Sequence, residues 1–313
     1  MINGTSVYYL DTLPYLHKGR AVALGFFDGI HIGHTEIIRK TVKTAVLEGL
    51  TSTVQTFVNF GKDGQGLLTT IEEKREILSS IGVDEMLVLD FDSVKDMAPA
   101  TFCDEILNMK LSSRALFAGC DYRFGKDAAG DVDMLRSFGA RIGADIDIFE
   151  DKLYGDSKRR VSSTWLREAL DKGEPELYSA LCAGRPFSYS GVVVKGNELG
   201  RKLGFPTANI EVPENKFEVK RGVYVSRVII GSRKLYGVTN VGVKPTVESE
   251  SALLAETFIF GFDEDIYGAR IKVELLKFLR PEQKFDSVET LANTVSADKE
   301  RAKTTLAKSG IIV

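Results

Sequence analysis

The pattern of apolar residues changes in kind near residue 185, and this change constrains the fold more than any other feature of the chain. Before it, segments of helical period alternate with short apolar runs, which lie at 21–27, 51–57, 86–91, 115–119 and 146–149. Such alternation predicts a parallel sheet covered by helices. After it, from 188 to 280, β-branched or alternating runs follow one another with only glycine-rich turns between them. Closely spaced strands of this kind predict a small antiparallel barrel.

Helices are predicted where apolar residues recur at intervals of three or four. In the α/β part of the chain these segments are 34–49, 71–81, 99–110 and 131–138, and a last helix is expected from Phe285 to about Ala307. A helical pair is predicted over 162–184, between the two patterns. At 313 residues the chain exceeds the size of most single cores. We therefore expect two domains, 1–185 and 186–313, divided at Gly184-Arg185-Pro186.

Composition excludes several classes of protein. The formal net charge of −3 provides no long-range attraction for nucleic acid or anionic lipid. The three cysteines, Cys103, Cys120 and Cys182, form no C-x-x-C pair, which argues against a disulfide framework and a zinc site. No stretch approaches the roughly 18 apolar residues of a membrane span, and the N-terminus lacks a basic leader with a long apolar run. We expect a cytoplasmic protein with small-molecule partners and no nucleic-acid or membrane partner; its oligomeric state is not predicted.

Two histidines follow the first long apolar run. That run leads into GFFDGIHIGH, from Gly25 to His34, and a predicted helix follows. The carboxyl ends of parallel strands form the usual ligand crevice, and a helix N-terminus there favours anions. His31 and His34 can then donate hydrogen bonds to a phosphoryl group during its transfer. The alternative is a pair of turn or capping histidines, but the chain has only three histidines in all.

A second possible anion site lies about 130 residues later, in RRVSSTWLR from Arg159 to Arg167. Ser and Thr at a helix start are most often caps, and Arg167 could be a solvated helix residue. The same residues also combine hydroxyls, free backbone N–H groups and a guanidinium, which together bind phosphate well.

The two motifs together resemble those of the nucleotidyltransferase superfamily. Between them stands GCDYRFGK, residues 119–126, which is similar to the G-x-D/N-F-x-F-G segment of bacterial FAD synthetases. This resemblance implies a Rossmann-like nucleotidyltransferase domain in which the phosphate of FMN attacks the α-phosphorus of ATP and pyrophosphate leaves. It implies catalytic roles for His31, His34 and Arg167. It also implies ATP-binding roles for Gly25, Asp28, Gly33, Asp121, Arg160, Ser163 and Thr164.

The chain departs from the FAD synthetase pattern at one place. In the family, Thr-Phe after the second strand usually continues into a Pro-His-Pro loop of the substrate crevice. Here Thr56-Phe57 is followed by Val58-Asn59-Phe60-Gly61-Lys62. A chain that phosphorylates riboflavin but has a weak or inactive first domain is therefore the alternative hypothesis.

The barrel-like part contains a second constellation, GNELGRKLGFPTAN, from Gly196 to Asn209. A glycine-rich loop allows the backbone to approach a ligand closely. The Thr207 hydroxyl and the Asn209 carbonyl oxygen are hard ligands suited to Mg²⁺ beside nucleotide phosphates. Taken alone, the segment could equally be a Gly/Pro-rich turn that caps a barrel.

This segment resembles the G-x-x-x-G-R-x-L-G-F-P-T-A-N signature of riboflavin kinases along its whole length, and AETF at 255–258 and FLR at 278–280 follow in the family's order. The resemblance implies that Glu256 is the general base and that Thr207 and Asn209 hold Mg²⁺. It implies nucleotide-binding roles for Gly196, Gly200 and Arg201, and a place for Arg280 on the flavin side. ATP, riboflavin, FMN and FAD are then the substrates and products. A flavin-binding regulator without turnover is the non-enzymatic alternative, which the presence of Thr207, Asn209 and Glu256 disfavours.

Overall fold

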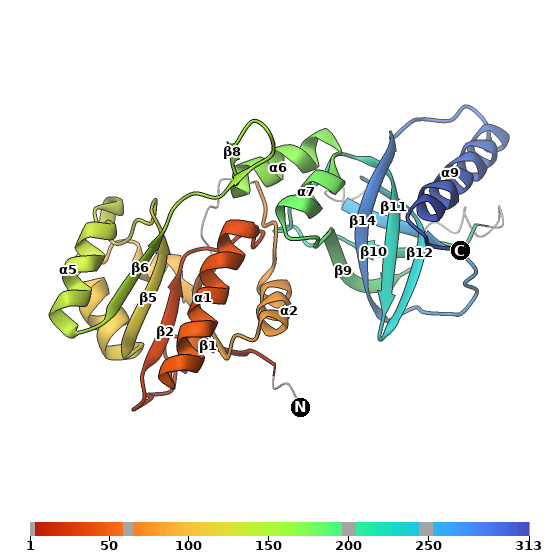
Figure 1. The fold of residues 1–313 in the computed structure, drawn as a ribbon. Helices are drawn as coiled ribbons and strands as arrows, with labels where there is room; N and C mark the ends of the chain where they lie inside the picture. The colour runs from red at the N-terminus through yellow and green to blue at the C-terminus, as the bar shows by residue number, and fades with distance from the viewer. Residues whose placement is uncertain (1–3, 59–64, 196–204, 244–252, 313) are drawn as a thin grey trace. The chain divides into compact units, whose positions relative to one another are not determined.

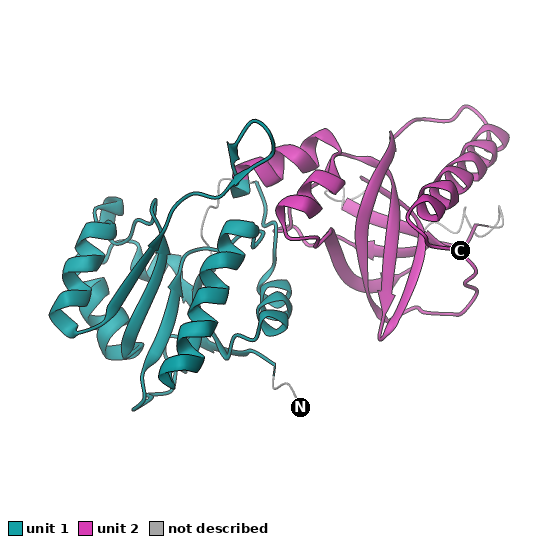
Figure 2. Ribbon diagram, in the orientation of Figure 1, with its two compact units in different colours: residues 1–163 teal, residues 164–313 magenta. Residues whose placement is uncertain are grey.

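The computed structural model describes residues 4–58, 65–195, 205–243 and 253–312 (Figure 1). The chain forms two compact units, 1–163 and 164–313 (Figure 2). The first is an α/β unit with a parallel sheet, and the second is an antiparallel barrel with a C-terminal helix. The predicted fold class is confirmed. Within the described ranges no helix is both long and apolar enough to cross a membrane.

The first unit is built on a six-stranded sheet in the order β1-β4-β3-β2-β5-β6, with every neighbouring pair parallel. The strands are β1 (Ser6–Tyr9), β2 (Arg20–Leu24), β3 (Thr51–Val58), β4 (Glu85–Asp90), β5 (Ser113–Gly119) and β6 (Asp145–Phe149). After β2 the chain builds outward through β3 and β4, and it then returns to place β5 on the other side of β2. The strand order therefore reverses beside β2, where ligands bind in open α/β sheets.

Both faces of this sheet are covered, because alternate residues of each strand point to opposite faces. On one face Ala21 and Ala23 pack with Ile38 and Leu78 of α1 (Ile32–Glu48) and α2 (Ile71–Ile81). On the other face Val22 and Leu24 belong to a core with the π-helix η1 (Phe102–Lys110) and α5 (Val132–Ile142). The short segments α3 (Phe91–Val94), α4 (Pro99–Thr101) and the 3₁₀ turn η2 (Lys126–Ala128) lie between β4 and α5 along the chain.

The elements differ from prediction mainly at their ends. The strand predicted over 21–27 ends at Leu24, because Phe27 has a φ of 52° that no strand accommodates. The segment 99–110 is helical as predicted, but most of it is the π-helix η1. β1 was not predicted, since it has four residues and both ends are exposed. The hairpin of β7 (Leu153–Tyr154) and β8 (Arg159–Arg160) was also missed.

The second unit is a closed barrel in the order β10-β13-β12-β11-β14-β9, with all neighbours antiparallel. Its strands are β9 (Phe187–Val194), β10 (Ala208–Glu211), β11 (Gly222–Ile230), β12 (Arg233–Val243), β13 (Leu253–Ile259) and β14 (Arg270–Pro281). Closure gives each of these strands a partner on both sides. Fully buried Thr239 donates a hydrogen bond of 2.7 Å to Ser226 and lies 2.9 Å from the Thr257 hydroxyl, so these hydroxyls satisfy one another across three strands.

Three helices accompany the barrel among the residues that the structure describes. α9 (Val288–Lys308) packs Ala302 and Leu306 against Val225 of β11. α6 (Ser163–Lys172) and α7 (Pro175–Leu181) are the predicted helical pair, and the Tyr178 ring meets Phe187 of β9 edge-on at 5.5 Å. The compact units thus divide at 163/164, after the first residue of α6. The boundary at 185/186 stays a prediction about the catalytic domains.

Candidate active sites

The loop between β2 and α1 carries the histidine motif in a strained backbone. Phe27 has a φ of 52° and Ile30 a φ of 43°, and for a β-branched residue such an angle is a real outlier. Strain of this kind costs about 1–3 kcal/mol per residue and persists where the surroundings impose it, which is typical of functional sites. Gly33 packs closely here, because a Cβ at this position would lie 3.2 Å from the His31 ring and would require a small shift of that ring.

His31 is the N-cap of α1, and its Nδ1 accepts a hydrogen bond of 3.3 Å from the backbone N–H of His34. A neutral imidazole whose Nδ1 is an acceptor carries its proton on Nε2. The two histidine rings are stacked, with centroids 3.6 Å apart and planes 18° from parallel. The capping geometry therefore leaves the Nε2–H of His31 as its hydrogen-bond donor.

Both histidines are neutral at pH 7. The pKa of His31 is lowered to about 4, mainly by burial and also by the Arg160 charge, and the Asp121 carboxylate opposes the shift. Burial also holds the pKa of His34 well below its usual value, and His31 and Lys74 add to this effect. The pair can thus offer N–H donors to a phosphate but no positive charge.

Asp28, a predicted ATP-binding residue, uses its carboxylate within the first unit. It accepts hydrogen bonds from the backbone N–H groups of Leu68 (3.2 Å) and Thr69 (3.0 Å), and it is 1% exposed. Its carbonyl oxygen accepts a bond of 2.8 Å from the hydroxyl of Ser163. Asp28 therefore joins the β2–α1 loop to the segment before α2, and Ser163 is held to the same loop.

Asp121 and Arg160 lie near His31. Asp121 follows β5, the strand on the far side of the reversal in the sheet, and its carboxylate accepts a hydrogen bond from the Arg160 guanidinium. Arg160 also pairs with Asp151 at 2.9 Å. The first unit thus brings His31, Asp121 and Arg160 together from three segments remote in sequence, at the carboxyl edge of the sheet.

Two further predicted residues, Thr164 and Arg167, belong to the second unit. Both lie on α6, and the Arg167 guanidinium lies 5.8 Å from the centroid of the Phe217 ring. Gly25 follows β2, and a Cβ at this position would lie 3.1 Å from the Phe27 ring. The ligand-binding roles of all three remain predictions.

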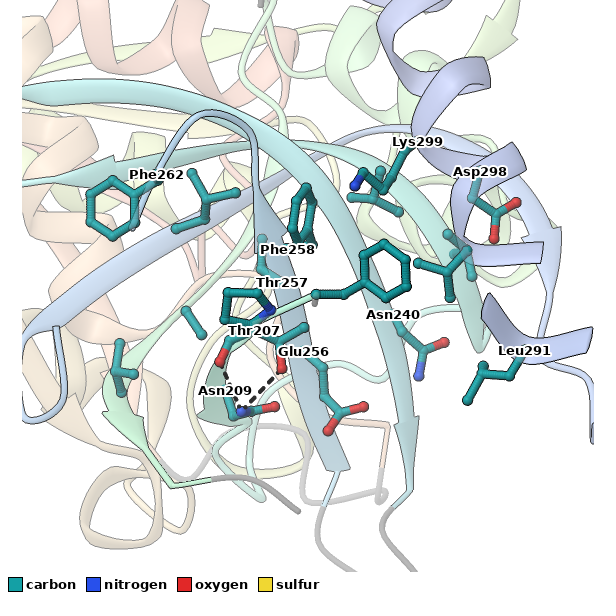
Figure 3. Close-up of a pocket in the computed structure, with 18 of the residues that line it drawn as sticks. Thr207, Asn209, Asn240, Glu256, Thr257, Phe258, Phe262, Leu291, Asp298 and Lys299 are labelled. Atoms are coloured by element: carbon teal, nitrogen blue, oxygen red, sulfur yellow. Dashed lines mark hydrogen bonds between the residues drawn. The ribbon is translucent and has the colours of Figure 1, made fainter. Parts of the chain in front are cut away.

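The barrel aligns the predicted kinase residues in one row. Asn209 of β10 pairs with Glu256 of β13, which pairs with Asn240 of β12. The row continues through Val223 of β11 to Arg280 of β14. Direct cross-strand partners share a face of a sheet, and Figure 3 shows Asn209, Glu256 and Asn240 around one cavity.

Asn209 has an oxygen without a partner among the described residues. Its amide nitrogen donates to the Thr207 carbonyl (3.2 Å) and hydroxyl (3.4 Å). Its Oδ1 is buried, and no described group donates a hydrogen bond to it. A buried acceptor left unsatisfied costs about 1–3 kcal/mol. The Thr207 hydroxyl and this oxygen are donors of the type that Mg²⁺ prefers, so the residues present fit the ion.

The cavity beside this row has a volume of about 640 Å³, within the range of small-molecule sites. Aromatic and aliphatic side chains make up much of its wall, including Phe205, Phe258, Phe262, Phe285 and Leu291. Leu291 comes from α9, which encloses one side of the cavity (Figure 3). Such a wall suits a flat aromatic ligand, while the Asn209–Glu256 end is polar.

Two residues of α9 that line the cavity were missed in the sequence. Asp298 is buried and accepts hydrogen bonds from Arg280 Nε (2.9 Å) and Nη2 (2.8 Å). Lys299 Nζ lies 4.2 Å from the centroid of the Phe258 ring and 4.7 Å from that of Phe205. Partial burial lowers the pKa of Lys299, the nearby charge of Lys303 lowers it as well, and Glu300 opposes the shift. The sequence around these two residues does not identify them, because tertiary packing decides which face of a helix lies against the barrel.

Some predicted positions lie outside the described residues. These are Gly196, Gly200 and Arg201 of the nucleotide loop, and residues 59–62 of the segment that replaces the Pro-His-Pro loop.

Comparison with known proteins agrees with the two units. A family model described as FAD synthetase matches residues 14–165, and one described as riboflavin kinase matches 183–306. Proteins named bifunctional riboflavin kinase/FMN adenylyltransferase align over almost the whole chain. That of Listeria monocytogenes is 33% identical over 308 residues, covering 96% of both chains. That of Escherichia coli K12 is 34% identical over 305 residues, covering 95% of both.

A solved structure also matches the chain. A crystal structure described as a macrolide-efflux protein from Streptococcus pneumoniae is 29% identical and has a TM-score of 0.82. The match covers 95% of this chain and 98% of that one. The fold is thus shared over 95% of this chain, whereas the family models and the curated relatives identify the chemistry. This chain belongs to the family of bifunctional riboflavin kinase/FMN adenylyltransferases.

Proposed function

We propose that the chain converts riboflavin to FMN in its riboflavin kinase domain, 186–313, and FMN to FAD in its nucleotidyltransferase domain, 1–185, with ATP as co-substrate of both reactions. The observation that carries the first assignment is the row Asn209–Glu256–Asn240 beside a cavity of about 640 Å³. The second rests on the histidine pair at the strand reversal and on the FAD synthetase match over 14–165.

In the kinase reaction, Glu256 accepts the proton of the terminal ribityl hydroxyl as that oxygen attacks the γ-phosphorus of ATP. ADP leaves, and the proton remains on the carboxylate until solvent takes it. Glu256 is suited to this role because it lies directly across from Asn209, and because it lines the same cavity as the aromatic side chains of Phe205, Phe258 and Phe285. The flavin ring then packs among the aromatic side chains, and Arg280, held by Asp298, completes the wall.

Mg²⁺ would be held by the Thr207 hydroxyl and the Asn209 Oδ1, the buried oxygen without a partner in the described part of the chain. When bound, the ion neutralises charge on the ATP phosphates. Asn209 is itself oriented by its two hydrogen bonds to Thr207, so the two ligands are fixed relative to each other.

In the adenylyl transfer, the FMN phosphate attacks the α-phosphorus of ATP and pyrophosphate leaves. No protein nucleophile is required. Neutral His31 and His34 donate N–H hydrogen bonds to phosphate oxygens. The family resemblance assigns further donors to Arg160, Ser163, Thr164 and Arg167. The protein thus accelerates this reaction by positioning the two substrates and by donating hydrogen bonds to the phosphates.

A chain with kinase activity alone is not favoured. The FAD synthetase model matches 14–165, and relatives named for both activities align over more than nine-tenths of the chain. The strained histidine loop is also intact.

A time course with riboflavin, ATP and Mg²⁺ tests the proposed function. We expect FMN to accumulate first and FAD to follow, as separated by chromatography, with pyrophosphate released in step with FAD. FMN that never proceeds to FAD would overturn the assignment of the first unit. Failure to form FMN, with conversion of supplied FMN to FAD, would overturn that of the second.

A further inference from the structure

Lys74 is a buried cation that no step described above uses. It follows the first turn of α2, which begins with a capping box between Thr70 and Glu73. Only 1% of Lys74 is exposed, which is rare for a lysine. A charge so buried needs strong compensating contacts.

Those contacts reach the histidine loop. Lys74 Nζ donates a hydrogen bond of 2.7 Å to the Phe26 carbonyl oxygen and one of 3.0 Å to Thr56 Oγ1. Thr56 Oγ1 in turn donates to the same Phe26 carbonyl at 2.7 Å, and Nζ lies 4.1 Å from the centroid of the Phe26 ring. The ammonium therefore joins the carboxyl ends of β2 and β3 at the first turn of the loop.

The position of this contact matters because the loop is strained. Phe27, which follows the bound carbonyl, and Ile30, which precedes His31, both have positive φ. Asp28 holds the middle of the loop through Leu68 and Thr69, whereas Lys74 holds its start. Without the Lys74 bonds, Phe26 loses this link to α2 and the backbone angle at Phe27 is less restrained.

We propose that Lys74 is a positioning residue for adenylyl transfer, which clamps the Phe26 carbonyl to Thr56 and so holds His31 and His34 where the phosphates react. The proposal rests on the proposed function of the first unit. A displacement of about 1 Å in such a site can cost on the order of 100-fold in rate. The clamp is expected to affect kcat more than KM, because the histidine contacts strengthen in the transition state.

The charge of Lys74 should make the rate of FAD formation depend on pH. Burial lowers its pKa to about 8, and the Asp28 carboxylate opposes the shift. The charged or titratable groups that interact with it are Asp28 in the loop and His34 on α1, while Glu73 on α2 is engaged at the Thr70 backbone N–H. Below this pKa the ammonium is charged and the clamp is intact. Above it the amine is neutral and both bonds weaken, so FAD formation should fall as pH rises from 7 to 9.

The test uses the full-length protein with FMN, ATP and Mg²⁺ supplied, and it compares Lys74→Met, Lys74→Arg and the matched control Arg75→Met. Arg75 is the exposed neighbour on α2. Thr56→Val is a milder fourth variant, since it removes one acceptor of the ammonium without removing the charge. FAD formation is followed from pH 6 to 9, with riboflavin phosphorylation and the thermal unfolding midpoint measured for each protein.

We expect Lys74→Met to lower kcat for FAD formation about 100-fold with a smaller change in KM, and Thr56→Val to lower it less. Lys74→Arg should retain more activity than Lys74→Met and lose the decline above pH 8, because a guanidinium stays charged. Arg75→Met should match the wild type, and riboflavin phosphorylation should be unchanged in all four. Full activity of Lys74→Met, or a decline above pH 8 that persists in Lys74→Arg, would overturn the proposal.

If both Lys74 variants fail to fold, Thr56→Val and the wild-type pH profile decide. An unaltered kcat in Thr56→Val together with a flat wild-type profile between pH 7 and 9 would also overturn it. Absence of FAD formation by the wild-type protein is a different result, since it would contradict the proposed function itself.

Discussion

Replacing Glu256 by glutamine is expected to abolish FMN formation from riboflavin and to leave adenylylation of supplied FMN at the wild-type rate. Glutamine keeps the size of the side chain and its place opposite Asn209, but it cannot accept the proton of the ribityl hydroxyl. Loss of a general base costs about 10²–10⁴-fold in rate. The rates of FMN and FAD formation, measured separately on the same preparation, provide the comparison.

Glu211→Gln is the matched control for Glu256→Gln. Glu211 is an exposed carboxylate at the end of β10, in the same barrel, and it does not line the cavity. We expect it to retain both activities. Near wild-type phosphorylation of riboflavin by Glu256→Gln would show that another group accepts the proton.

Removing both histidines, with His31→Ala and His34→Ala together, should stop FAD formation and spare FMN formation. The two N–H donors act on phosphate oxygens in the transition state, and loss of a single donor of this type costs about 10²–10³-fold. The loss should be similar across pH 6 to 8, because the pKa of His31 is lowered to about 4 and that of His34 lies well below its usual value. FAD formation from supplied FMN, measured at several pH values, checks both points.

The chain contains its own control for this experiment. His17 is the third histidine and is exposed, with its ring edge-on to Tyr15 at 5.1 Å. His17→Ala should retain both activities. An equal loss of kinase and adenylyltransferase activity in the double variant would mean that the histidines support the whole protein and not one site.

The periodicity of apolar residues predicted the architecture of both units. The ends of individual strands could not be predicted in this way, because they depend on tertiary structure. The clearest case is β2, whose apolar run predicted a strand but not the point at which it ends. That point is set by the turn at Phe27, which the surroundings hold at positive φ. β1 lies at the edge of the sheet and is half exposed, so neither hydrophobicity nor length marked it.

The candidate sites were predictable where residues adjacent in sequence act together. The histidine pair and the Thr207–Asn209 pair are of this kind, and each lies within three residues along the chain. The row that joins Asn209 to Glu256 and Arg280 depends on strand register, which single sequences specify poorly. The family resemblance, and not the pattern of residues, pointed to Glu256.

Buried charges were the hardest features to foresee. Lys74 and Asp298 each lie on a helix whose sequence is rich in charge, so neither differs from its solvated neighbours along the chain. Only the structure shows that Lys74 reaches the Phe26 carbonyl and that Asp298 holds Arg280. The sequence also did not indicate that the Asp28 carboxylate accepts hydrogen bonds from the backbone N–H groups of Leu68 and Thr69, and its predicted role in ATP binding stays a prediction.

We infer that riboflavin is phosphorylated beside the polar row of the barrel. A crystal structure of the full chain with ADP, Mg²⁺ and FMN is the sharpest test of this site. We predict Mg²⁺ at about 2.1 Å from Asn209 Oδ1, the Thr207 hydroxyl as a second ligand, and the FMN phosphate beside Glu256. A nucleotide and metal bound to the second unit away from Thr207 and Asn209 would contradict the account.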